Sequence, residues 1–366
     1  MSRSDIGEAT RPALATDALP RGILLYNVAG IVYETGVMSP EVEHPDTHTR
    51  PSPAVPTKSE AGKLLVVSIR CGRLGNRLAL FANLIAFAEE HGHRLINFTF
   101  HSYADLFEAT RRDVFCRYPR ATGPSWLDMI PGVGGAIRKT RIFYHAVRGL
   151  SVLNEKLPVF GQKAVTLREG RAQLIIHLES PEMQARLAEA RVVFVHGFIF
   201  RAPAAMQKHA EKIRAYFRPI AAYEQASAQA VAPLRQAGEI VIGMHIRHAD
   251  QRTWQGGRYY FPASRYAQWM KELTEQFPGK KVSFLVCSDE PRRRDEFPGL
   301  SIGFGPGSPL GDMYALAKCD YILGAVSSYS QWSSFYGDKP LYQLRSTDNH
   351  PELKEFKVSY LDDIPH

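Results

Sequence analysis

The chain has 366 residues, of which 45% are hydrophobic, so it can bury more than one core and we expect two domains. Its formal net charge of +8 suits an anionic small molecule, a membrane surface or a nucleic acid, and does not by itself choose among them. No aromatic RNA-binding signature or zinc-knuckle spacing occurs, so we expect no nucleic acid partner.

Residues 1–62 are rich in proline, threonine, serine and alanine, and we expect a disordered or loosely ordered arm there. The apolar stretch 22–38 is interrupted by Asn27 and Glu34 and has no basic flank, so it is too short and too polar to span a bilayer. The cysteines are scattered at positions 71, 116, 287 and 319. That usage is typical of a reduced, cytoplasmic protein.

The first half of the ordered chain begins with an apolar strand at 64–69, a glycine turn at 72–76 and a buried helix that ends at Gly92. A strand at 95–98 follows. Residues 103–161 are basic and broken by prolines and by the glycine run 132–135, so we expect a loop-rich insertion. Later elements of this half are strands at 174–176 and 192–195 and helices at 181–190, 204–216 and 223–237.

The second half alternates regularly from residue 238 onward. Its expected strands are 240–242, 282–286, 321–323 and 341–344, and its expected helices are 263–277, 310–317 and 328–336. Strands that alternate with helices form parallel sheets. The sequence therefore predicts an α/β protein with two sheets in tandem, divided into domains 63–237 and 238–366.

Polar side chains gather directly after the strand at 240–242, where His245, Arg247, His248 and Asp250 follow one another. Ligands bind at this edge of an open α/β sheet, and an arginine can hold a phosphate through paired charge-assisted hydrogen bonds. A zinc site would need a third ligand nearby, so we expect no metal. Arg247 is the strongest candidate, because a buried arginine needs a partner. His248 is plausible as a core histidine.

Three further groups also follow predicted strands. The turn with Arg73, Gly75 and Asn76 offers glycines and free helix amides, although a purely structural turn is the preferred interpretation of it alone. Asp289 either caps a helix or accepts the paired N–H donors of guanine. The third group is made of Ser327, Ser328 and Ser330, whose hydroxyls either cap a helix or, with its amides, hold a diphosphate.

These groups occur in an order that resembles the GDP-fucose-dependent fucosyltransferases, the group with bacterial alpha-1,2-fucosyltransferases and protein O-fucosyltransferases. The resemblance covers residues 63–344. Residues 72–76 are similar to the G-x-x-G-N turn of these enzymes, and residues 245–250 are similar to their H-x-R-R-x-D motif. Ser288 and Asp289 are similar to their central S/T-D pair, and residues 312–332 are similar to the ending of the alpha-1,2 enzymes. The departures are His248 for an arginine, Gln331 for a tryptophan, and Gln255 where alpha-1,6 members have a glutamate.

The resemblance implies two facing Rossmann-like domains in the GT-B arrangement, with the acceptor on the first and the donor on the second. It implies that Arg247 holds the diphosphate, that His245 and Asp289 hold the guanine, and that Arg73 and Asn76 border the fucose. The amides and hydroxyls of residues 327–330 would bind the phosphates. Asp250 would be either the base that activates the acceptor or the group that orients Arg247.

The implied activity is inverting, metal-independent transfer of fucose from GDP-fucose to a glycan hydroxyl, with no cofactor and with an alpha-1,2 linkage favoured. The resemblance leaves open a lipid-linked acceptor and peripheral association with the inner face of the membrane. Three alternatives remain: use of another GDP-sugar, a non-catalytic nucleotide-sugar or carbohydrate-binding protein, and polyanion binding through the basic segment 111–148, for which a solvated face is the preferred interpretation.

Overall fold

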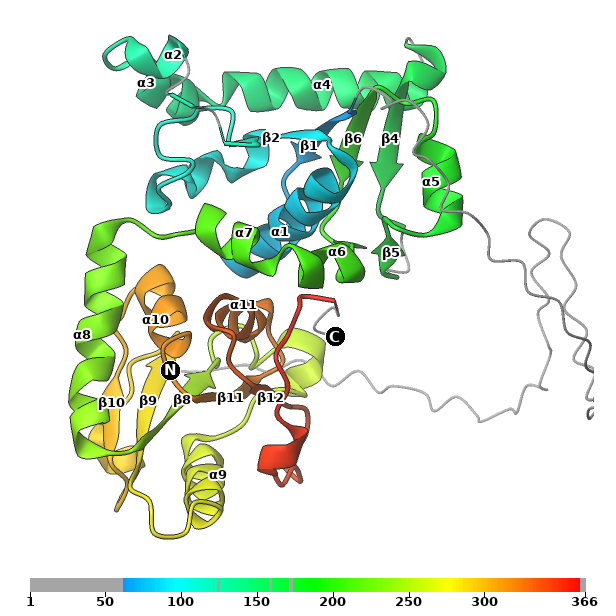
Figure 1. The fold of residues 1–366 in the computed structure, drawn as a ribbon. Helices are drawn as coiled ribbons and strands as arrows, with labels where there is room; N and C mark the ends of the chain where they lie inside the picture. The colour runs from blue at the N-terminus through cyan, green and yellow to red at the C-terminus, as the bar shows by residue number, and fades with distance from the viewer. Residues whose placement is uncertain (1–61, 121, 124–125, 158–159, 171–173, 363–366) are drawn as a thin grey trace, which may run out of the picture. The chain divides into compact units, whose positions relative to one another are not determined.

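The computed structural model describes residues 62–120, 122–123, 126–157, 160–170 and 174–362. The expected arm at 1–62 lies, apart from residue 62, outside the described residues. From residue 62 on, the described chain belongs to one compact unit that contains two five-stranded sheets (Figure 1).

The first sheet is built from the apolar runs of the first half in the order β3-β2-β1-β6-β4, and only β3 runs antiparallel to its neighbour. Its strands are β1 (Leu64–Ile69), β2 (Arg94–Asn97), β3 (Arg117–Tyr118), β4 (Ala164–Arg168) and β6 (Val192–His196). The short strands β5 (Ile176–His177) and β7 (Phe200–Arg201) pair separately. Edge strand β4 has buried residues only at its first and fourth positions, which is why the sequence pattern did not reveal it.

Helix α1 (Leu74–His91) follows β1 through the glycine turn and is buried along most of its length. It ends as expected at Gly92, whose φ of 64° is a left-handed conformation and whose N–H binds the carbonyl of Ala88. In the middle of α1, the Asn83 amide accepts from the N–H of Ala202 at 2.8 Å and donates to the carbonyl of Leu361 at 3.4 Å. Helix α1 therefore ties together segments from three parts of the chain.

The expectation of a loop-rich insertion at 103–161 is wrong for its second part. That part forms α2 (Trp126–Met129), α3 (Val133–Thr140) and the four-turn helix α4 (Ile142–Lys156). No proline occurs between positions 132 and 157, and α3 and α4 are separated at Arg141, whose φ of 57° is left-handed. Helix α4 packs against β1 and β4, with Phe143 and Val147 in a small apolar cluster around Phe98.

The second sheet is entirely parallel, in the order β10-β9-β8-β11-β12. Its strands are β8 (Ile240–Ile246), β9 (Val282–Ser288), β10 (Ile302–Phe304), β11 (Tyr321–Ala325) and β12 (Leu341–Leu344). Its helices are α9 (Ala263–Glu275), α10 (Pro309–Leu316) and α11 (Ser328–Gly337). The expected α/β class with two parallel sheets is confirmed, and β10 is an additional edge strand.

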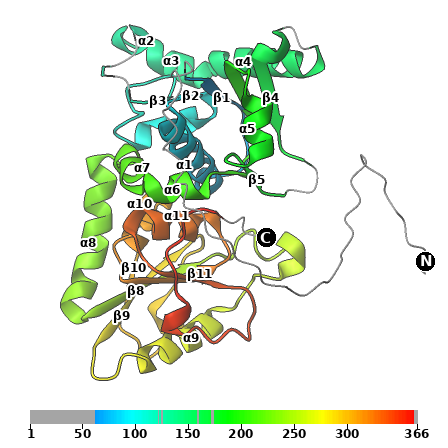
Figure 2. The same ribbon diagram turned by 45° about the vertical axis from the view of Figure 1, so that its right-hand side comes forward.

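Helix α8 (Ala221–Ala237) packs with the second sheet, although the sequence assigned it to the first half. It contacts β9, β10 and α10, and it lies beside β10 in both views (Figure 1 and Figure 2). Leu234 is buried with Val241 and Leu285. The remaining helices are α5 (Pro181–Leu187), α6 (Pro203–Lys208) and α7 (Ala210–Tyr216), so the single helix expected at 204–216 is divided at His209.

Buried contacts join the two halves. Leu310, Met313 and Trp332 of the second half belong to the same apolar cluster as the core of α1. The Tyr314 hydroxyl donates to the carbonyl of Phe217 at 2.5 Å, and Arg214 donates to the carbonyl of Phe335 at 2.8 Å. The two sheets therefore do not have wholly separate cores, and the starts of α1 and α11 come close to each other.

Candidate functional site

Arg247, in the first turn after β8, is held by Asp250. Its Nε and Nη2 donate to the two carboxylate oxygens at 2.8 and 2.6 Å, a bidentate pair that fixes the plane of the guanidinium. The third nitrogen, Nη1, lies 3.4 Å from the Ser327 hydroxyl at the start of α11. The hydrogen bonds from Arg247 lower the pKa of Asp250, so the carboxylate is ionised at neutral pH. Both side chains are about one-third accessible, and a ligand can reach them.

Arg73 brings a second guanidinium to the same carboxylate. It occupies the N-cap position of α1, its side chain is 82% exposed, and its Nη1 lies 3.6 Å from an Asp250 oxygen. The two guanidinium groups and the Asp250 carboxylate together carry one net positive charge. Such an arrangement favours an anion with several oxygens, as a phosphate group has.

Gly75 allows the turn after β1 to reach the start of α11. A Cβ at this position would lie 2.7 Å from the Ser328 Oγ and 3.0 Å from the Tyr329 backbone nitrogen, so only glycine fits without a shift. Asn76 folds back over Gly72, whose φ of 66° is left-handed. The structure thus brings the predicted turn residues and the predicted serines together.

The serines at the start of α11 mainly shape the helix end. Ser327 is the N-cap and accepts from the N–H of Tyr329 at 3.2 Å, whereas the Ser330 hydroxyl donates to the carbonyl of Ser327 at 3.1 Å. Both are buried, and Ser328 is partly exposed. The helix end carries a partial positive charge that adds to the charge of Arg247.

His245 lies at the end of β8 as a neutral, buried group. Its ring stacks on Tyr329 with centroids 4.7 Å apart, and Gly324 on the neighbouring strand leaves room for it. Burial, and secondarily the charge of Arg247, lowers the pKa of His245 to about 3. The neutral imidazole can therefore donate or accept a hydrogen bond with a ligand, but it adds no positive charge to the site.

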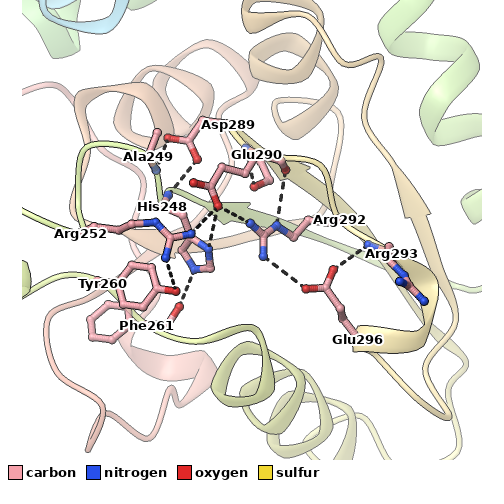
Figure 3. A network of polar contacts seen from close by, with 11 residues as sticks. His248, Ala249, Arg252, Tyr260, Phe261, Asp289, Glu290, Arg292, Arg293 and Glu296 are labelled. Carbon is pink, nitrogen blue, oxygen red and sulfur yellow. Dashed lines mark hydrogen bonds and ion pairs between the residues drawn. The ribbon is translucent and has the colours of Figure 1, made fainter. Parts of the chain in front are cut away.

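Asp289 holds the turn that carries Arg247. Its two oxygens accept from the backbone N–H groups of His248 and Ala249 at 2.8 and 3.2 Å, as Figure 3 shows. The side chain is exposed, so free lone pairs of the carboxylate still face solvent. A structural role for Asp289 is present in the fold, and guanine recognition by it stays a prediction.

The interpretation of His248 as a core histidine is confirmed. The ring is 1% exposed, packs on Tyr260, and donates from Nε2 to the carbonyl of Phe261 at 2.6 Å (Figure 3). Its Nδ1 lies 3.7 Å from Glu290, which also binds Arg252 and Arg292. Burial lowers the pKa of His248. The contacts of this side chain are therefore with Tyr260, Phe261 and Glu290, and they tie the turn after β8 to that segment and to the end of β9.

Asp312 is a carboxylate that the sequence pattern did not single out as a site residue. It is 7% exposed, accepts from the N–H of Gly307 at 2.8 Å, and lies beside Cys287 at the end of β9. Burial raises its pKa to about 6. The available signal was an acid in the first turn of a helix, directly after the glycine-rich loop 305–308.

No group of three or more histidine, cysteine, aspartate or glutamate side chains lies close enough to hold a metal ion, as far as the described residues extend. The four cysteines are free thiols, and three of them are buried.

No protein-family model matches the chain. Over 130 residues the chain is 28% identical to nodulation protein Z of Azorhizobium caulinodans, and the aligned part is 27% of this chain and 40% of that protein. In structure it is similar to a mutant of Arabidopsis thaliana FUT1 in complex with GDP, with 13% identity, coverage of 82% of this chain and 75% of that chain, and a TM-score of 0.49. It is also similar to NodZ alpha-1,6-fucosyltransferase soaked with GDP-fucose, with 16% identity, coverage of 81% and 97%, and a TM-score of 0.45.

Proposed function

We propose that this protein is a metal-independent glycosyltransferase of the GT-B type that moves fucose from GDP-fucose to a glycan hydroxyl. The observation that carries the proposal is the Arg247 guanidinium, fixed by Asp250 beside the start of α11 and next to Arg73. The partial sequence similarity to nodulation protein Z supports it.

The chemistry needs a group that stabilises negative charge on the departing diphosphate. Arg247 is held by Asp250 before a ligand arrives, and its Nη1 lies 3.4 Å from the hydroxyl of Ser327, the N-cap of α11. Preorganised donors of this kind typically contribute ~3 to 4 kcal/mol to transition-state stabilisation. The acceptor hydroxyl then attacks the anomeric carbon from the opposite face as the bond to the diphosphate oxygen breaks, which inverts the configuration. GDP leaves with the bonding electrons, and the hydroxyl proton passes to water.

Asp250 acts in this proposal by orienting Arg247. A carboxylate whose pKa is lowered by a bidentate arginine is a weak proton acceptor, so the geometry favours orientation over general-base catalysis.

Two carboxylates compete for recognition of the guanine N1 and N2 donors. Asp289 is exposed but already accepts two backbone N–H groups, and Asp312 is buried at the end of β9 with a raised pKa. Comparing affinities for GDP and inosine diphosphate, which lacks the 2-amino group, in Asp289→Asn and Asp312→Asn assigns the role. The variant that loses the preference for GDP over inosine diphosphate identifies the carboxylate that recognises guanine.

The linkage in this proposal is alpha-1,2, because residues 312–332 resemble the ending of the alpha-1,2 enzymes and Gln255, where alpha-1,6 members have a glutamate, counts against alpha-1,6. Gln255 has a φ of 49° in a tight turn shortly after Asp250. Nuclear magnetic resonance of the product decides between this linkage and alpha-1,6.

The experiment that tests the function combines donor binding with turnover. Calorimetry should give tighter binding of GDP than of UDP or ADP, and Arg247→Ala should lower kcat by roughly 10²-fold to 10³-fold. Arg293→Ala is the matched control, because Arg293 is exposed and contacts only its neighbours Asp295 and Glu296 among the described contacts. Preference for UDP, or equal turnover in wild type and Arg247→Ala, would overturn the proposal. Turnover with a different GDP-sugar would keep the mechanism and replace the donor.

A further inference from the structure

Helix α4 has an apolar stripe on the side that faces away from the protein. Phe143 and Val147 point inward to the first sheet, while Ser151 and Asn154 are buried. The stripe recurs at the helical spacing of three or four residues and consists of Ile142, Ala146, Leu150, Leu153 and Leu157. Its large members are exposed by 60%, 41%, 46% and 62%. A helix that covers a sheet needs one apolar face, and α4 has two.

More exposed apolar side chains flank this helix in the sequence. Met129 at the end of α2, Ile130 directly after it, and Phe160 after α4 are 69%, 45% and 46% exposed. We define the α4 surface as Met129, Ile130, Ile142, Leu150, Leu153, Leu157 and Phe160. Of the large hydrophobic side chains that the described residues leave exposed, only Leu174, Trp254 and Phe304 lie elsewhere. Such a concentration marks an interaction site.

The charges around the α4 surface are mainly positive. Arg141, Arg148 and Lys156 are exposed at the start, middle and end of α4. In the sequence from 129 to 157 the only acidic residue is Glu155, and its carboxylate is bound by Arg168 at 3.2 Å. By helical spacing these cations lie along one side of the stripe, and the stripe itself contains no negative charge.

We propose that the α4 surface docks on a lipid bilayer that contains anionic headgroups. An interfacial helix lies in the plane of the membrane with its apolar side among the upper acyl chains and its basic side chains at the headgroups. The apolar stripe and the exposed cations of α4 fit that position. Among the residues that the structure describes, no helix is both long and apolar enough to cross a bilayer.

Charge complementarity favours a membrane over the other occupants. A second copy of the chain could dock through the same surface on a two-fold axis. The cations Arg141, Arg148 and Lys156 would then lie close to the same cations of the other copy. A nucleic acid would use the cations but would leave the apolar stripe in water. An anionic bilayer satisfies both the apolar and the cationic components. This inference does not rest on the proposed transfer reaction, since binding to vesicles requires no turnover.

Vesicle flotation of the full chain tests the inference. Vesicles of phosphatidylcholine alone are compared with vesicles that also contain phosphatidylglycerol, at low and at high salt. The triple variant Ile142→Gln, Leu150→Gln, Leu153→Gln removes apolar contact without adding charge. The triple variant Arg141→Gln, Arg148→Gln, Lys156→Gln removes the cations. Leu174→Gln is the matched control, because Leu174 is 73% exposed and lies outside the α4 surface.

We expect the wild type to float with the anionic vesicles and to lose binding as salt rises. Each triple variant should bind at least about a hundredfold more weakly, since it removes three apolar contacts or three charges. Leu174→Gln should bind like the wild type. Absence of binding to anionic vesicles overturns the inference. So does a dimer that the apolar triple variant converts to monomer, or equal binding by wild type and both triple variants. Circular dichroism of each variant checks that the exposed substitutions leave the fold intact.

Discussion

Gly75 in the first turn of α1 lies against Ser328 in the first turn of α11, with no space for a side chain between them. A Cβ at position 75 would meet backbone as well as the Ser328 hydroxyl, and a backbone contact cannot be relieved by a rotamer change. We therefore expect Gly75→Ala to lower the free energy of unfolding by about 1 to 3 kcal/mol and to reduce turnover. Urea titration and a donor-hydrolysis assay measure the two effects.

Gly135→Ala is the control for this substitution. Gly135 lies in α3 with nothing within 4 Å of the added Cβ, so alanine should stabilise the helix by up to ~1 kcal/mol. If Gly75→Ala were as stable and active as the wild type, the close approach of α1 and α11 would be refuted.

The pair formed by Arg247 and Asp250 predicts the phenotype of Asp250→Asn. The amide keeps the shape of the carboxylate but can accept through only one oxygen, so the guanidinium loses one of its two anchors. We expect kcat to fall by roughly tenfold to a hundredfold while the shape of the pH profile stays unchanged. Disappearance of an ionisation from the acidic limb of the profile would instead identify Asp250 as the base.

His245 and Asp312 predict opposite effects of pH on stability. The folded protein keeps His245 neutral down to a pKa of about 3, whereas an unfolded histidine takes up a proton near 6.5. Below pH 6.5 the unfolded state therefore binds more protons, and stability falls as the pH decreases toward 3. The same sign holds for His93, whose pKa is lowered to about 4 by burial. Asp312 acts the other way, because its folded pKa of about 6 exceeds the unfolded value of 3.8 and stability falls as the pH rises through that range.

Urea titrations at a series of pH values check this balance. Between pH 4 and 6, His245→Asn should make stability depend less steeply on acidification, and Asp312→Asn should make it depend more steeply. Each change is limited to about 1.4 kcal/mol per pH unit. The slope is the diagnostic quantity, since either substitution also shifts stability at every pH. Slopes that change in the same direction contradict the assignment.

The packing of His248 predicts that replacing it by arginine, the residue that the fucosyltransferases have at this position, will not make this protein more stable. The side chain is 1% exposed and faces Glu290, which already binds Arg252 and Arg292. A third guanidinium there overfills the space and adds like charge, so His248→Arg should cost at least about 2 kcal/mol of stability. His248→Gln, which can still donate to the Phe261 carbonyl, should cost less. Thermal denaturation compares them, and a stabilised arginine variant would refute the packing described for His248.

The regular alternation of the second half could be predicted because its strands are buried on both faces and contain apolar runs, although the expected strands at 240–242 and 282–286 stop short of the ends of β8 and β9. Edge strands β4 and β10 were not predicted, because they are short and contain few buried residues. Helix α4 escaped for a different reason. Its apolar residues lie on two sides, so no single periodic face stands out against the polar positions.

The site could be predicted in its components but not in its connections. Arg247 and Asp250 are close in sequence, and the turn after β8 suffices to pair them. The contact of Gly75 with Ser328 and the ion pair of Arg73 with Asp250 depend on the packing of α1 against α11, which no local pattern encodes. The support of the turn by Asp289 likewise comes from a neighbouring strand.

The hydrogen bond between Asn83 and the carbonyl of Leu361 has a consequence for synthesis. Leu361 is fully buried and belongs to the same apolar cluster as Leu65 and α1. A nascent chain therefore cannot complete the packing around α1 until residue 361 has left the ribosome. Until then the part of the α1 cluster that Leu361 covers is exposed to chaperones and to other chains.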